Sequence, residues 1–182
     1  TEEFFKFVGM RLDEFLSWDH HTKHVSNKIT SATFALNQVK NVLPFHVRKF
    51  MYNSLIRCHI ENGILAYSGV NSKGVKKIKT LQKRSVRLVA GKSRVAHTDP
   101  IFAKLNILKA EDLFELNTGI FLHKYINNIL PVSFNDMFTP LSKPNRTHNF
   151  KLEKTFCKFL DSFPKVTLPK TWNNLRLDLK SS

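Results

Sequence analysis

A dense block of positive charge over residues 73–94 constrains this chain more than any other segment. Its lysines and arginines are Lys73, Lys76, Lys77, Lys79, Lys83, Arg84, Arg87, Lys92 and Arg94. No Asp or Glu occurs from Asn62 through Thr98. Apolar residues such as Ile78, Leu81 and Leu88 recur at helical spacing. The pattern predicts an amphipathic helix that turns its cations toward solvent and ends at Gly91.

Some of these cations form a row one helical turn apart, namely Lys76, Lys79, Lys83 and Arg87. Like charges in such a row repel one another on a folded helix unless a polyanion neutralises them. A solvated basic face is the plain alternative, but the missing acids favour a phosphate backbone as partner. We therefore expect the nucleic-acid-binding residues to be Lys76, Lys79, Lys83, Arg84, Arg87, Lys92 and Arg94.

The composition of the whole chain agrees with this expectation. It has 29 Lys and Arg against 14 Asp and Glu, a net charge of +15, and 16 Phe in 182 residues. A basic chain this rich in apolar residues is typical of a folded nucleic-acid binder or of a protein on an anionic membrane surface. Residues 73–91 lack an aromatic anchor and no apolar run is long enough to span a bilayer, so we expect no membrane partner. We expect the protein inside the cell, in the nucleus or in a ribonucleoprotein.

The pattern of apolar residues predicts a mainly α fold, a helical bundle preceded by a short β-hairpin or strand and followed by a less regular tail. The expected parts are a hairpin and connector over 1–18, a helical domain over 19–138, and a linker with tail over 139–182. Helices are predicted over about 19–42, 44–63, 75–91, 99–105, 109–128 and 169–179, with a loop over 71–74. Trp18, between the hairpin and the first helix, is expected to be buried.

Residues with catalytic or metal-binding chemistry are sparse. Glu111 and Asp112 are adjacent, so on a helix they point to different faces and cannot chelate one magnesium ion. His20 and His24 would share a helix face, but no third ligand follows at suitable spacing. We expect no catalytic residue, no metal site and no cofactor in this segment.

The order of short motifs resembles the end of the reverse transcriptase of LINE-type, non-LTR retrotransposons of the jockey and CR1-like kind. The matching pieces are Phe5-Lys6-Phe7-Val8-Gly9-Met10, Asp13, Leu16-Ser17-Trp18, His21, Leu43-Pro44, the segments 52–56, 81–87, 97–102 and 127–134, and Trp172-Asn173. Each piece is short, and together they cover nearly the whole chain in the family's order.

The resemblance implies a role at the template–primer duplex. Lys6, Phe7, Val8 and Gly9 would correspond to the primer grip, and the helices that follow would form a thumb that contacts phosphates of an RNA, RNA–DNA or DNA duplex. Fingers, palm and the magnesium-binding aspartates would lie before this chain begins and would be its protein partner. The resemblance thus implies the non-catalytic part of an RNA-directed DNA polymerase, with no small-molecule substrate of its own.

Another function stays open from the residues alone. The chain could be a stand-alone or domesticated RNA-binding or structural domain, with no polymerase attached. The coding sequence upstream separates the two, since a polymerase requires an in-frame palm with two adjacent aspartates.

Overall fold

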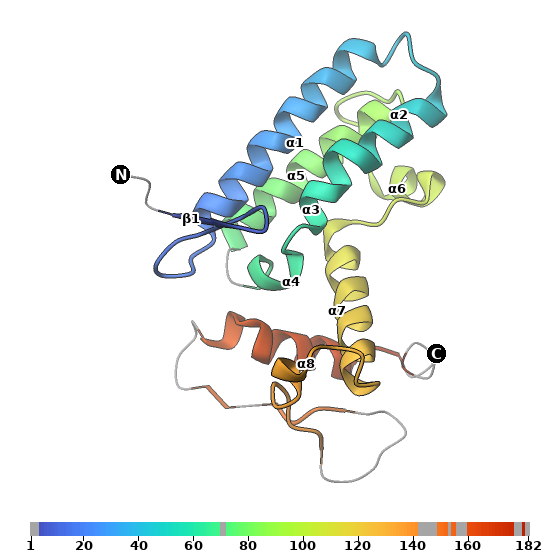
Figure 1. Cartoon of the computed structure of the whole chain (residues 1–182). Helices are drawn as coiled ribbons and strands as arrows, with labels where there is room; N and C mark the ends of the chain where they lie inside the picture. The colour runs from blue at the N-terminus through green and yellow to red at the C-terminus, as the bar shows by residue number, and fades with distance from the viewer. Residues whose placement is uncertain are drawn as a thin grey trace. The chain divides into compact units, whose positions relative to one another are not determined.

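The computed structural model describes residues 4–69, 72–141, 149–152, 154–155, 160–176 and 180. It is mainly helical with a short two-stranded hairpin at the N-terminus, as the sequence predicts (Figure 1). The chain forms two compact units, Thr1–Leu113 and Phe114–Ser182. The domain boundaries expected from the sequence, after residues 18 and 138, stay a prediction.

The N-terminal hairpin consists of β1 (Phe5–Phe7) and β2 (Met10–Leu12), which pair antiparallel with Phe7 opposite Met10. The two turn residues both have positive φ, 46° at Val8 and 77° at Gly9. This is the backbone of the tight turn that matches the twist of two antiparallel strands. Glycine adopts it freely, whereas a β-branched valine adopts it only with strain.

Three helical segments form the centre of the first unit. Helix α1 (Asp19–Val39) packs along α5 (Ser72–Val89). The third segment comprises α2 (Phe45–Tyr52), a π-helical turn (Asn53–Arg57) and α3 (Cys58–Glu61), which follow one another without a break. Figure 1 shows these segments side by side, and their facing apolar residues form the core.

The π-helical turn aligns two buried residues of the third segment. Tyr52 and Ile60 are each fully buried, yet eight positions of a regular α-helix would turn them about 80° apart. A π turn takes up one extra residue, which reduces this difference to about 20°. Both side chains therefore lie on the same, buried side of this segment.

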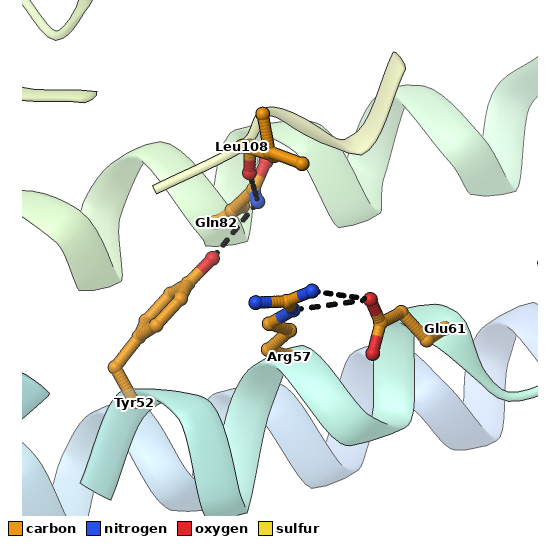
Figure 2. A network of polar contacts seen from close by, with 5 residues as sticks. All are labelled: Tyr52, Arg57, Glu61, Gln82 and Leu108. Carbon is orange, nitrogen blue, oxygen red and sulfur yellow. Dashed lines mark hydrogen bonds and ion pairs between the residues drawn. The ribbon is translucent and has the colours of Figure 1, made fainter. Parts of the chain in front are cut away.

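A buried glutamine joins three parts of this unit (Figure 2). Gln82 Nε2 donates to Tyr52 Oη at 2.9 Å and to the Leu108 carbonyl at 3.0 Å, and its Oε1 accepts from Ala110 N at 3.0 Å. Nearby, the Arg57 guanidinium pairs with Glu61 Oε1 at 3.0 Å along the third segment. The glutamine thereby satisfies the buried amide of Ala110 and the partly buried carbonyl of Leu108.

Trp18 connects the hairpin to α1, as expected. Its side chain is 7% exposed, and its backbone N–H donates to Asp13 Oδ2 at 3.2 Å. The Trp18 ring meets the His21 imidazole edge-on at 5.9 Å, and His21 in turn lies against Tyr67 of the short helix α4 (Ile64–Tyr67). The prediction of a buried tryptophan at this junction is confirmed.

Helix α5 begins earlier than the sequence suggested. The loop expected over 71–74 is wrong for residues 72–74, which form the first turn of α5. Gly74 lies directly against Thr22 of α1, so close packing of the two helices holds this turn in helical form.

At the other end of α5, Gly91 has φ 63°, and Lys92 N donates to the Arg87 carbonyl. That bond is typical of a glycine-terminated helix, so the predicted end is confirmed.

Helix α6 (Asp99–Leu105) has the predicted bounds, with Pro100 in its first turn. Its buried residues Ile101, Phe102 and Leu105 add to the core of the first unit. Helix α7 (Ala110–Ile126) follows close to the predicted bounds and extends into the second unit.

The second unit holds the 3₁₀ turns Val132–Phe134 and Leu160–Ser162 and helix α8 (Pro164–Asn174). An aromatic cluster includes Tyr125, Phe138 and Phe150, whose rings lie 5.0 to 5.8 Å apart. Asn173 exchanges two hydrogen bonds with the backbone of Phe150, at 3.0 and 2.8 Å. The prediction that the last helix begins at Pro169 is wrong, because α8 starts five residues earlier at another proline.

Candidate nucleic-acid interface

Helix α5 separates apolar and charged residues as the sequence predicts. Its buried residues are Ile78, Gln82, Ser85, Val86 and Val89. Its exposed cations are Lys73, Lys76, Lys77, Lys83 and Arg84, and we call this set the α5 basic face. Lys76 and Lys77 lie about one turn from Lys73, and Lys83 and Arg84 lie about two turns further on, so these cations share one side of the helix.

Lys79, one of the predicted row, has an acidic partner. Its Nζ lies 2.7 Å from Glu111 Oε1, with the two side chains 31% and 52% exposed. Partial burial raises the pKa of Glu111, but the hydrogen bond from Lys79 and the nearby Lys83 outweigh it and hold that pKa below its usual value. The ion pair joins α5 to the first turn of α7, so Lys79 has a structural contact besides any role in binding.

Arg87 also has a contact within the protein. Its Nε donates to the Ala96 carbonyl at 2.7 Å, which fixes the loop between α5 and α6. Lys92 and Arg94 project from that loop and are exposed. Two of the predicted cations, Lys79 and Arg87, are thus half-buried and held by contacts within the protein. The others are exposed, and a ligand can reach them: Lys76, Lys83, Arg84, Lys92 and Arg94.

A cation that the sequence did not single out extends this group. A shallow hollow of about 330 Å³ lies between α1 and the start of α5, and its lining includes Lys23, Lys73 and Lys77. Asp19 also lines the hollow, so three lysines and one aspartate give the lining a net charge of about +2. Lys23 is exposed on α1, so the positive surface is built from two helices.

The primer-grip-like residues lie at the turn of the hairpin. Lys6, Phe7, Val8 and Gly9 are all exposed, with Phe7 at 61% and Val8 at 76%. Gly9 lies close to the Asn62 side chain, since an added Cβ would be 3.0 Å from its Nδ2. The hairpin thus presents apolar side chains to solvent, and their proposed role stays a prediction.

Two other features, a metal site and a membrane-spanning helix, are not found in the described part of the chain. Among them, no three His, Cys, Asp or Glu side chains gather where they could hold a metal ion. His20 stacks on the Phe4 ring instead, with 5.2 Å between the ring centres. Within the same described part of the chain, no helix is both long enough and apolar enough to cross a membrane.

The geometry of the exposed cations suits a backbone of phosphates better than a single small anion. The α5 basic face covers about three helical turns, whereas one phosphate would occupy one or two side chains. Comparison with known proteins adds no candidate: no protein-family model, curated protein or solved structure matches this chain.

Proposed function

We propose that this chain is the non-catalytic, nucleic-acid-binding C-terminal part of the reverse transcriptase of a non-LTR retrotransposon, and that it grips the template–primer duplex. The supporting observation is the strip of exposed cations on α5, Lys73, Lys76, Lys77, Lys83 and Arg84, together with Lys23 of α1. The order of family-like motifs in the sequence indicates the class of polymerase, a non-LTR reverse transcriptase. In this proposal the missing fingers and palm supply the catalytic magnesium site.

Binding would be electrostatic and independent of base sequence. Lysine and arginine contacts to phosphates position a protein on a duplex but do not read its bases. Each contact releases counterions from the nucleic acid, so affinity falls as salt rises, with a log–log slope of about −0.9 per contact on duplex DNA. The slope therefore counts the cations that contact phosphate.

The test replaces Lys76, Lys83 and Arg84 together by glutamine, which keeps helix propensity nearly unchanged. These residues are chosen because they are exposed, unlike Lys79 and Arg87. Duplex binding is measured by fluorescence anisotropy from about 50 to about 200 mM salt. We expect the triple variant to flatten the slope by about 2 to 3 and to weaken binding equally on unrelated sequences.

A matched control is the replacement of Lys124, Lys151 and Lys170 by glutamine. These exposed lysines lie in the second unit, and their loss removes the same three positive charges. Equal slopes for the two triple variants would mean that only net charge matters, which contradicts the proposal. Binding to phosphatidylserine vesicles that exceeds duplex binding would contradict it as well.

The polymerase itself is tested by the coding sequence upstream of Thr1. An in-frame palm with two adjacent aspartates supports the proposal, because paired carboxylates hold the metal ions of nucleotidyl transfer. An open reading frame without a palm would favour the stand-alone RNA-binding domain.

A further inference from the structure

A second hollow lies at the far end of α5 from the Lys23 hollow. It measures about 490 Å³ and falls within the usual size range of a small-ligand site. Its lining comes from the first residue of α2, the end of α5 and one side of α6, namely Phe45, Ala90, Lys92, Pro100, Ile101, Lys104 and Leu105.

The floor and wall of this hollow are apolar. Ile101 and Leu105 are 8% and 4% exposed and form part of the core. Phe45 is 44% exposed and is one of the residues that line the hollow. A flat apolar group could therefore pack against the phenylalanine without disturbing the fold.

The charged members of the lining are both cations. Lys92 and Lys104 are exposed, and the glycine-terminated end of α5 fixes the backbone of Lys92. The acid of α6, Asp99, is engaged elsewhere, since its Oδ1 lies 2.8 Å from Lys109 Nζ. The hydrogen bond and the charge of Lys109 hold the pKa of Asp99 below its usual value. An anion at the hollow would meet two lysines.

We propose that this hollow binds an unpaired nucleotide, with the base packed against Phe45 and its phosphates next to Lys92 and Lys104. Aromatic rings that stack on bases, combined with cations that follow the backbone, are the usual means of holding a single strand. The inference rests on the proposed duplex binding along α5. Arg84 and Ala90 are six residues apart, roughly 9 Å along the helix and about 120° around it, so a strand that leaves the duplex would pass around the end of α5 to reach the hollow.

The test compares a blunt duplex with the same duplex carrying a short single-stranded overhang. We expect the overhang to increase the affinity of the full 182-residue chain by about tenfold, a gain typical of one stacked base. Phe45→Ala removes this gain and leaves blunt-duplex binding unchanged. Phe50→Ala is the matched control, since Phe50 lies on the same helix, is 70% exposed and is not part of the lining.

Lys104→Gln gives a second variant at an exposed position, where a change of fold is not expected. It should reduce the overhang gain and lower the salt slope of overhang binding by about one. As a direct readout, 2-aminopurine in the overhang should lose fluorescence on binding to the wild-type chain and to Phe50→Ala, but not to Phe45→Ala.

The outcomes separate the two proposals. If the chain binds no duplex, the proposed function fails. If it binds blunt duplex with a steep salt slope but gains nothing from the overhang, or if Phe45→Ala matches Phe50→Ala, only the nucleotide site is overturned. If a peptide of alternating Glu and Leu binds and loses affinity with Phe45→Ala while the overhang effect is absent, the hollow is a protein-docking site and the inference is wrong.

Discussion

The side-chain amide of Gln82 donates a hydrogen bond to the hydroxyl of Tyr52 over 2.9 Å inside the core of the first unit. Both residues are almost completely buried. Burial raises the pKa of Tyr52 to about 12 despite the hydrogen bond from Gln82, which lowers it, so the hydroxyl remains protonated at neutral pH. The same glutamine also satisfies Leu108 O and Ala110 N. Gln82 lies on the buried side of α5, and its hydrogen bonds join this helix to two other segments. The opposite side of the same helix carries the cations.

Replacing Gln82 by leucine should lower the free energy of unfolding by about 3 to 5 kcal/mol. The change leaves the buried Tyr52 hydroxyl, the buried Ala110 amide and the partly buried Leu108 carbonyl without this partner. A buried unsatisfied polar group costs roughly 1 to 3 kcal/mol. Urea denaturation measures the loss. Tyr52→Phe is the control: it removes one hydrogen bond and leaves the other two, so it should cost about 1 kcal/mol. Equal losses for the two variants would show that the backbone contacts of Gln82 contribute nothing.

Two helical glycines should respond to alanine in opposite directions. At Gly74 an added Cβ would lie 2.5 Å from Thr22 Cβ, so α5 must move away from α1 at a cost of about 1 to 3 kcal/mol. At Gly119 of α7 the nearest contact would be at 3.9 Å, and alanine should gain up to about 1 kcal/mol from helix propensity. Thermal melts of the two variants test this, and an increase in Tm for Gly74→Ala would contradict the close packing.

Folding stability should fall as pH drops below about 7 because of His21. Burial lowers the pKa of this imidazole, the hydrogen bond to Asn62 O raises it, and Arg11 lowers it further, with a net shift downward. The unfolded chain therefore binds a proton near the ordinary pKa of 6.5, whereas the folded chain does so only at lower pH. The stabilisation is complete above the unfolded pKa and decreases as pH falls toward the folded one.

Urea melts at several pH values between about 5 and about 8 measure this loss. His21→Gln should flatten the pH profile even though the variant is less stable. His24 and His59, whose pKa values burial also lowers, leave a smaller residual slope. His46→Gln removes an exposed imidazole as the control, and an equal flattening by that variant would assign the effect to residues other than His21.

The hairpin turn should be stabilised by Val8→Asn. Valine at φ 46° is strained, whereas asparagine before glycine is the preferred pair in this two-residue turn. Val8 is 76% exposed, so its replacement loses little packing, and we expect a gain of about 1 kcal/mol. Denaturant melts measure it, with Val95→Asn as the control at another exposed valine, which is 89% exposed. No gain would indicate that the folded hairpin does not depend on this turn.

Much of the first unit could be predicted from the sequence because its signals are local. The apolar spacing of α5, Gly91 at its end and the Asp99-Pro100 start of α6 act between neighbours in the chain. The two element starts that were wrong depend on more than neighbours. The Ser72-Lys73-Gly74 sequence is typical of a turn, but packing of Gly74 on Thr22 favours a helix. At α8, either of two prolines could begin the helix, and only the structure selects Pro164.

The candidate site was predictable only in part. Periodicity placed Lys76, Lys83 and Arg84 on an exposed face, and the structure agrees. The pairing of Lys79 with Glu111 depends on where α7 begins relative to α5, which no spacing within one helix can show. Lys23 and Lys104 could not be predicted as lining residues for the same reason. Each lies on a different helix that meets α5 or its end.

The π-helical turn between Tyr52 and Ile60 also changes what a deletion would do. Loss of one residue from a regular helix turns everything after it by about 100° relative to what comes before. Loss of one residue from Asn53–Arg57 would instead leave a plain α-helix in which both buried side chains still face the core. A one-residue gap in a related chain at this point would therefore be compatible with an intact fold.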